Sequence, residues 1–274
     1  MKVTVRQATA EDHLLYLRLL PELGVDDPPP DGARFVSELL PTMLVAEIGG
    51  EAVGLCTWLK FEGSGHVRSL IVDPRARRSG VGRALLEVVA GKLRDAGCST
   101  WTLNVKPENV GAVGLYTSMG FRRDYASVAM SLSWAAVPAL PQSPPVQARA
   151  VTPEDDRALE RLFSLPAGQV ENRRRSKRVL LTLVDGAGEL VALSAYDPSN
   201  PNANPFRVKE PSLARALLEA MHAHALPGAE STGVVVANDE ALFALLQTNG
   251  ASVRMHIDHY AGSVPSPLRG RGSG

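Results

Sequence analysis

Apolar and polar residues follow one another along this chain in a pattern typical of a mixed α/β protein. Each half predicts short strands, bounded by glycine or proline turns, that are interleaved with amphipathic helices. The first half predicts strands near 2–7, 42–48, 52–61, 66–73, 100–105 and 121–133, and helices near 10–20, 32–40, 80–96 and 109–119. The second half predicts strands near 179–185, 189–196, 232–237 and 252–261, helices near 153–163, 211–225 and 239–248, and a loop at 197–205. We therefore expect a central sheet in each half.

The two halves resemble each other at both of their ends. Residues 5–20 (VRQATAEDHLLYLRLL) parallel residues 148–163 (ARAVTPEDDRALERLF), and each predicts a short strand, a threonine helix cap and an amphipathic helix. Residues 109–121 (NVGAVGLYTSMGF) parallel residues 239–251 (DEALFALLQTNGA). Two copies of one fold are the economical interpretation. A proline-rich linker at 135–147 then separates a domain at 1–134 from one at 148–262, and 263–274 forms a flexible tail.

Composition narrows the class of protein. Of 274 residues, 45% are hydrophobic and 21% are charged, and the formal net charge is zero, which argues against a dedicated nucleic-acid binder. No apolar run approaches the ~20 residues that span a bilayer, and the first residues lack a signal-peptide pattern. The two cysteines, Cys56 and Cys98, form no CxxC pair and favour a reducing compartment. We expect a cytoplasmic protein without a membrane or nucleic-acid partner.

The segment from His66 to Leu86 carries the most informative chemistry. An apolar strand ends at Asp73-Pro74, a basic turn with two glycines follows, and a helical pattern begins near Val81. Such a turn presents free N–H groups to a phosphate, and glycine allows close backbone approach. The turn lacks the GxxxxGK[ST] of a P-loop NTPase and the third glycine of a dinucleotide-binding GxGxxG. A basic surface turn that only caps a helix remains the alternative for an isolated GxG.

Two motifs together resemble the GNAT superfamily of acyl-CoA-dependent N-acyltransferases. The turn fits the family pattern R-x-x-G-x-G, and about thirty residues later the chain resembles the pattern N-x-x-A-x-x-L-Y-x-x-x-G-F. The matching residues are Arg77, Gly80 and Gly82 in the first motif, and Asn109, Ala112, Leu115, Tyr116, Gly120 and Phe121 in the second. The resemblance covers residues 1–134 well and 146–262 only in outline. It implies two GNAT-like domains, each with a mixed, mostly antiparallel sheet flanked by helices, in an α/β (α+β) class.

The resemblance also implies acetyl-CoA as cosubstrate and a set of residues that bind it. The pantetheine arm of acetyl-CoA would pair with the strand backbone, and Asn109 and Ala112 would flank this arm from the next helix. The pyrophosphate would lie on backbone N–H groups of the turn, with Arg77 beside them. The strand residues are Leu70, Ile71 and Val72, and the turn residues are Arg78, Ser79, Gly80, Val81, Gly82 and Arg83.

Two residues are candidates for catalysis. The family's tyrosine commonly protonates the departing thiolate, and Tyr116 matches it; a buried core aromatic is the alternative. Many members carry a glutamate base where this chain has His66, which strand alternation would place in register with Leu70 and Val72. The alternative for His66 is an exposed histidine without a catalytic role. In that case Glu47 and Glu62 are weaker candidates for the base, or the acceptor binds as its neutral amine. The oxyanion would meet an N–H near Ile71 or Val72.

The resemblance implies that the acceptor is a primary amine of a small molecule, a peptide or a protein, and we expect a monomer or a homodimer. Asp26 and Asp27 lie where the family builds the acceptor wall, although a solvated loop is the simpler interpretation. No histidine or cysteine spacing predicts a metal site. Neither cysteine lies in a motif, which favours direct attack in a ternary complex over an acyl-enzyme.

The second half has lost both motifs. Glu210-Pro211 stands where the basic glycine turn should be, and Leu246 stands opposite Tyr116. We therefore predict that the second half binds no CoA and catalyses nothing. Two other functions compete with the enzyme: a non-catalytic acyl-CoA-binding or regulatory module, and an NAD-binding oxidoreductase.

Overall fold

The computed structural model describes residues 2–24, 29–176 and 178–266, which form two compact units. The first unit contains residues 1–105 and 109–123 together with the C-terminal segment from Tyr260 onward. The second contains residues 106–108 and 124–259. No helix in the described ranges is both long and apolar enough to cross a membrane.

The first unit is built on a sheet whose strands follow the order β1-β2-β3-β4-β5, with the end of β12 beside β5. The pairs β1–β2, β2–β3 and β3–β4 are antiparallel, whereas β4–β5 is parallel. These strands are β1 (Val3–Gln7), β2 (Met43–Ile48), β3 (Glu51–Lys60), β4 (Ser64–Val72), β5 (Thr100–Val105) and β12 (Ser252–Ser263). The predicted sheet type, mixed and mostly antiparallel, is confirmed.

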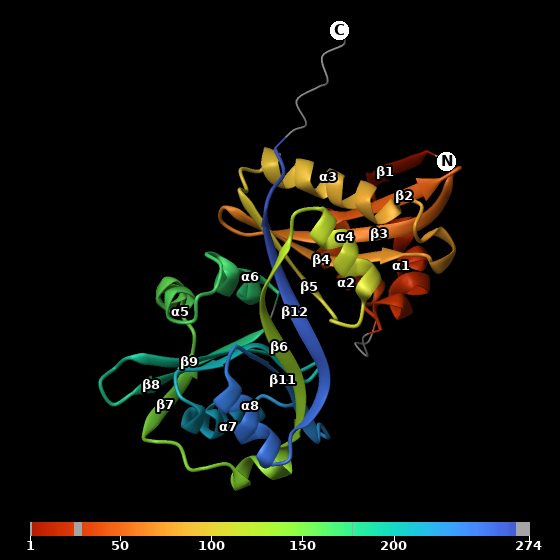
Figure 1. The fold of residues 1–274 in the computed structure, drawn as a ribbon. Coiled ribbons are helices and arrows are strands. Elements are labelled where there is room, and N and C mark those ends of the chain that lie inside the picture. The colour runs from red at the N-terminus through yellow and green to blue at the C-terminus, as the bar shows by residue number, and fades with distance from the viewer. Residues whose placement is uncertain (1, 25–28, 177, 267–274) are drawn as a thin grey trace. The chain divides into compact units, whose positions relative to one another are not determined.

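Helices cover both faces of this sheet (Figure 1). The long helix α3 (Val81–Asp95) packs on one face, where Leu85, Leu86 and Val89 join the largest core cluster of the unit. The opposite face carries α1 (His13–Leu19), α2 (Gly32–Arg34) and the π-helical turn Phe35–Leu39, with a smaller core of its own. Helix α4 (Val110–Ser118) follows β5 and contributes Tyr116 to the α3 side. Each face is therefore closed by a separate apolar cluster.

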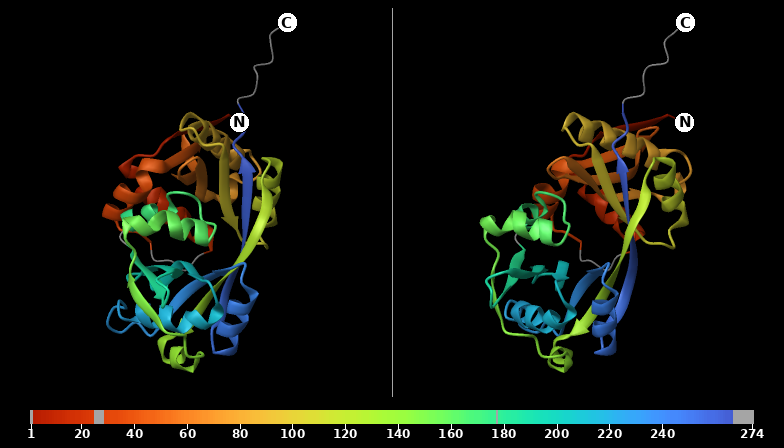
Figure 2. Two further views of the ribbon diagram at one scale, coloured as in Figure 1. Left: turned by 90° about the vertical axis from the view of Figure 1, so that its left-hand side faces the viewer. Right: turned by 60° about the vertical axis from the view of Figure 1, so that its left-hand side comes forward.

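The second unit repeats this arrangement with the strand order β6-β11-β10-β9-β8-β7. The pair β10–β11 is parallel, whereas β6–β11, β10–β9, β9–β8 and β8–β7 are antiparallel. Its strands are β6 (Arg122–Ser133), β7 (Val146–Ala150), β8 (Val179–Asp185), β9 (Leu190–Asp197), β10 (Asn202–Val208) and β11 (Ser231–Ala237). Helices α7 (Ala214–His222) and α8 (Glu240–Thr248) cover one face, and α5 (Asp156–Leu162) and α6 (Gln169–Arg175) lie over the other (Figure 2).

Local interactions repeat between the units, as the sequence parallel predicts. Arg6 bonds Asp12 at 2.8 Å, and Arg149 bonds Asp155 at 2.6 Å. In each case the same carboxylate accepts the N–H of a threonine that caps the following turn, at 2.7 Å and 2.8 Å. The duplication therefore extends to individual hydrogen bonds.

The compact units divide the chain differently from the predicted boundaries. Beyond residue 123, β6 pairs with β11 of the second unit, and residues from Tyr260 onward belong to the first. The expected linker at 135–147 begins with a 3-10 helix, Trp134–Ala139, whose Trp134 and Val137 are buried in the second core. The contacts of the final strand, β12, decide this division, and the sequence does not show which strands β12 lies beside.

Two local predictions also need correction. Residues 202–205, predicted as loop, form the start of β10, because polar side chains are tolerated where the strand pairs on both sides. Of the helix predicted at 32–40, only Gly32–Arg34 is a regular α-helix; Phe35–Leu39 forms a π-helical turn, and a 3-10 turn begins at Leu40. Residues 263–266 of the predicted tail are described, and the rest of it lies outside the described residues.

Candidate active site

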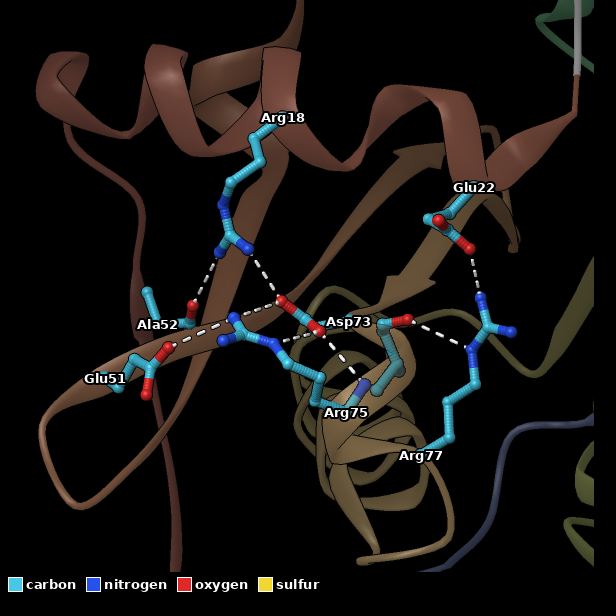
Figure 3. Close-up of polar contacts among 8 residues, drawn as sticks. Arg18, Glu22, Glu51, Ala52, Asp73, Arg75 and Arg77 are labelled. Atoms are coloured by element: carbon cyan, nitrogen blue, oxygen red, sulfur yellow. Dashed lines mark hydrogen bonds and ion pairs between the residues drawn. The ribbon is translucent and has the colours of Figure 1, made fainter.

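A buried aspartate anchors the turn that follows β4 (Figure 3). Asp73 is 3% exposed and accepts Arg18 Nη1 at 2.6 Å and Arg75 Nη2 at 2.9 Å. Its Oδ1 also accepts the backbone N–H of Arg75 at 3.0 Å, which caps the 3-10 turn Pro74–Ala76. These bonds, with Arg75 first, hold the pKa of Asp73 well below its usual range. From the sequence, Asp73 is visible only as the end of a strand; an acid next to proline and arginine is the signal that could have identified this anchor.

The turn between Arg77 and Val81 takes a left-handed path. Arg78 has φ +65° and Gly80 has φ +87°, and α3 begins directly afterwards. A Cβ at Gly80 would meet nothing within 4 Å, so its glycine is required by backbone conformation and not by crowding. The first intrahelical N–H bond of α3 is Ala84 to Gly80, at 3.0 Å. The earlier N–H groups have no such partner and are suited to an anion.

Gly82 has a different role from Gly80. A Cβ there would come within 2.9 Å of Leu115 Cδ2, so the missing side chain lets α3 and α4 approach closely. Arg83 Nη2 bonds Ser118 on α4 at 2.7 Å. The guanidinium of Arg83 therefore fastens the two motif helices together, and its backbone N–H remains the group that can face a phosphate.

Arg77 is the side chain of the first motif with a defined polar environment. Its Nη2 bonds Glu22 at 2.5 Å, and its Nε bonds the carbonyl of Val72 at 3.3 Å (Figure 3). The carbonyl contact ties the turn to the end of β4. Glu22 would have to share or release Arg77 if this side chain binds a phosphate.

Strands β4 and β5 part beyond the start of β4. Their parallel pairing runs from Ser64 with Thr100 to Val67 with Leu103. Leu70, Ile71 and Val72 are still paired with β3 on their other side. Asp73 donates its N–H to Val53 of β3, so in this register Ile71 also bonds toward β3, and the N–H groups of Leu70 and Val72 face the β5 side. The predicted arm of the cosubstrate would lie along this edge.

The predicted register of His66 is wrong. Thr57 of β3 pairs with Ser69, but Trp58 pairs with Val67, so β4 has an extra residue at Arg68. A β-bulge of this kind reverses side-chain alternation. Gly65 and Val67 face α3, as Leu70 does. His66 therefore lies on the opposite face, where its Nδ1 is 2.9 Å from Thr102 Oγ1.

Residues of the second motif also have defined structural roles. The Asn109 side chain accepts the N–H of Ala112 at 3.1 Å and caps α4. Tyr116 is 6% exposed and packs edge-on against Phe121, with ring centroids 6.0 Å apart. Burial raises the pKa of Tyr116, so its hydroxyl stays protonated at neutral pH. Burial also raises the pKa of Cys56 to about 12, which makes this thiol a poor nucleophile.

One of the weaker candidates, Glu47, has a defined ionic partner away from the turn. Glu47 is bonded to Arg6 at 2.6 Å, and Asp26 and Asp27 lie outside the described residues. Within the described ranges no group of three or more histidine, cysteine or acidic residues could hold a metal ion. A cavity of about 590 Å³ lies in the second unit against β7, β8 and α7, and none of the predicted site residues lines it.

Part of this chain is similar in sequence to known acetyltransferases. Residues 13–121 match the sequence profile of the acetyltransferase (GNAT) family. The [ribosomal protein bS18]-alanine N-acetyltransferase of Escherichia coli K12 is 39% identical over 80 residues, which are 27% of this chain and 54% of that enzyme. The chain thus spans about half the length of the curated relatives that it matches first.

Solved structures extend the likeness to the whole fold. A GCN5-related N-acetyltransferase from Sphaerobacter thermophilus superposes with a TM-score of 0.67 at 16% identity, covering 97% of each chain. A tandem GNAT protein from the clavulanic acid biosynthesis pathway gives a TM-score of 0.63 at 18% identity, over 97% of this chain and 100% of the other. At such identities the likeness concerns the fold alone, and that fold is a tandem one.

Proposed function

We propose that this chain, which belongs to the GNAT superfamily of acetyltransferases, transfers an acetyl group from acetyl-CoA to a primary amine. The observation that carries the proposal is the left-handed turn at Arg78 and Gly80, which opens onto the N-terminus of α3 beside the split edge of β4. A pyrophosphate fits the N–H groups at the start of α3, and a strand-like arm that carries amides fits the split edge of β4. The phosphate ligands would be backbone N–H groups of residues 78–83, with Arg77 beside them after exchange from Glu22.

The chemical step is a direct transfer. The amine nitrogen forms a bond to the thioester carbonyl carbon, and the carbon–sulfur bond breaks. Tyr116 donates its phenolic proton to the leaving thiolate; burial raises the pKa of this hydroxyl, which keeps it protonated at neutral pH until the thiolate leaves. The backbone N–H of Val72, next to the split of β4, would stabilise the tetrahedral oxyanion, whereas the N–H of Ile71, the other candidate, faces Leu55 of β3.

The amine must lose a proton, and His66 is the proposed base. Its bond to Thr102 fixes the ring on the face of β4 that also carries Ser69 and Ile71. This placement requires the amine to approach from that face, or a water molecule to relay the proton. An acceptor that binds already neutral would make His66 dispensable.

The test is CoA release from acetyl-CoA with a panel of primary amines. The panel should include peptides with an N-terminal alanine, because a relative acetylates the alanine of a ribosomal protein, as well as small amines and amino acids. Saturable release with at least one acceptor supports the enzyme. Binding of acetyl-CoA without turnover of any amine would instead favour a non-catalytic acyl-CoA-binding module.

The base can be tested separately with His66→Gln, which keeps a polar partner for Thr102. If His66 is the base, kcat/KM falls and the acidic limb of its pH profile disappears, while acetyl-CoA affinity is unchanged. An unaltered pH profile in His66→Gln would show that the solvent accepts the proton of the amine.

We propose for the second unit a structural role without CoA binding, since Glu210 and Pro211 offer an acidic side chain and one N–H fewer.

A further inference from the structure

The second unit has its own split between parallel strands, and an arginine lies in it. Strands β10 and β11 pair only at Asn202 with Gly233 and at Ala203 with Val234. Beyond this point Arg207 takes the position that Ile71 has in the first unit. The neighbouring strands establish the equivalence, because Arg207 pairs with Leu193 of β9 as Ile71 pairs with Leu55 of β3. Two residues later, Lys209 and Asp73 each donate an N–H to the equivalent carbonyl of that strand, at 2.8 Å.

The guanidinium of Arg207 bridges the two separated strands. Its Nη1 donates to the carbonyl of Phe206 on β10 at 3.1 Å and to that of Val235 on β11 at 3.2 Å. Its Nε and Nη2 make no hydrogen bond, and no carboxylate lies within 4 Å of it, in the part of the chain that the structure describes. Burial lowers the pKa of Arg207, which expresses the cost of holding this charge without a counterion.

Polar and aromatic groups surround the same place. The rings of Tyr125 on β6 and His259 on β12 stack with centroids 4.0 Å apart and planes 11° apart. His259 Nε2 is 2.7 Å from the hydroxyl of Ser127, which is buried. Burial, and after it the charge of Arg207, lowers the pKa of His259 to about 4, so the imidazole is neutral at pH 7. Arg207 is then the cation of this cluster.

Acidic residues around the cluster act on it without bonding the guanidinium. Asp239 acts to raise the pKa of Arg207, Asp258 acts to raise that of His259, and Asp124 acts to raise that of Tyr125. None of these effects outweighs burial for Arg207 or His259. The two unused nitrogens of Arg207 therefore keep the directional donors that a planar anion requires.

We infer that the split between β10 and β11 binds a small carboxylate on the Nε and Nη2 donors of Arg207, with an apolar part of the same molecule against the Tyr125–His259 pair. A carboxylate matches the planar fork with two parallel hydrogen bonds and supplies the missing counterion. The second copy would thus have exchanged the acyl-arm position of the fold for an anion site. This inference does not depend on acetyl transfer by the first unit.

The probe is benzoate, a planar carboxylate with one aromatic ring, titrated into the full-length chain and followed by the imidazole resonances of His259. We expect saturable binding at millimolar concentration or tighter. The pKa of His259 should rise in the complex, because a nearby anion favours the imidazolium and offsets Arg207. Arg207→Gln should weaken benzoate binding by at least tenfold. Arg161→Gln, which removes an exposed charge on α5, should leave the affinity unchanged.

Arg207 also braces the two strands, so Arg207→Gln could unfold the unit. Arg207→Lys then provides the comparison, since it keeps the charge but loses the fork and should bind benzoate several-fold more weakly than the wild type. If 20 mM benzoate, which corresponds to roughly 2 kcal/mol of binding free energy, does not shift the His259 resonances, Arg207 only braces the two strands and binds no carboxylate. Equal affinity in a folded Arg207→Gln would overturn the site, and binding of inorganic phosphate in preference to benzoate would overturn the carboxylate assignment.

Discussion

The turns that precede α3 and α7 differ in length and charge, although the helices that follow them keep the same buried core. The sequence Arg-Ala-Leu-Leu-Glu occurs at 83–87 and again at 215–219. Its two leucines are fully buried in both units. Ten positions separate Asp73 from Arg83, whereas six separate the equivalent Lys209 from Arg215. The second copy therefore lacks four residues of the turn and retains the packing of the helix, so the turn that we propose to bind the pyrophosphate is not needed for the fold.

The largest effect should come from Tyr116, which has Leu246 as its counterpart in the second unit. If Tyr116 is the acid, Tyr116→Phe keeps the ring in the core and lowers kcat by about 10²–10⁴-fold. The KM for acetyl-CoA should change little, because the phenol acts on the leaving sulfur. Tyr260→Phe, another buried tyrosine, is the matched control for steady-state kinetics. A kcat within twofold of the wild type for Tyr116→Phe would remove Tyr116 from the mechanism.

Reversing the charge of the turn should imitate the second copy. Counting back from the shared helix sequence, Glu210 is the equivalent of Arg78. Arg78→Glu should weaken acetyl-CoA binding about tenfold or more in calorimetric titrations at low salt, because a carboxylate would face the pyrophosphate. Lys92→Glu, at the other end of α3, should leave the affinity unchanged. Similar losses in both variants would indicate a general charge effect and not a cradle at the turn.

The anchor of the turn should be visible as stability. Asp73→Asn removes the charged partner of Arg18 and Arg75 and should destabilise the first unit by about 2 kcal/mol in urea unfolding. The folded-state pKa of Asp73 is depressed, so its contribution is complete above the ordinary pKa of ~4 and is lost as the pH falls below it. The difference between wild type and Asp73→Asn should therefore shrink in acid. A difference that stays constant down to pH 2 would assign the effect to packing.

The smallest effect should come from Gly82, the glycine of α3 that contacts Leu115 on α4. Alanine occupies the equivalent position, Ala214, in the second unit. Gly82→Ala places a Cβ against the end of the Leu115 side chain, which can move, and alanine favours the helix. We expect a stability change below about 1 kcal/mol by thermal unfolding, with acetyl-CoA affinity reduced only if α4 is displaced. Gly80→Ala, at a left-handed φ, should cost about 1–2 kcal/mol and is the comparison.

Local signals were sufficient for much of this protein. Periodicity located most helices and strands, and the two glycine positions with their basic neighbours identified the turn before α3. The duplication was also legible, because Arg6 with Asp12 and Arg149 with Asp155 are short-range pairs that any copy of the turn must preserve. These features depend on residues within about ten positions of each other. Such residues meet whatever the rest of the chain does.

Tertiary structure decided the features that depend on pairing between distant segments. The bulge at Arg68 moved His66 to the other face of β4, because one extra residue opposite Thr57 and Trp58 reverses the alternation that sequence assumes. The buried contacts of Asp73 with Arg18, and the place of Arg207 across a split between strands, follow in the same way from register. The sequence by itself determined the fold, its duplication and the glycine turn before α3. The face each candidate side chain occupies was decided by strand pairing, whose register is not encoded in any one segment.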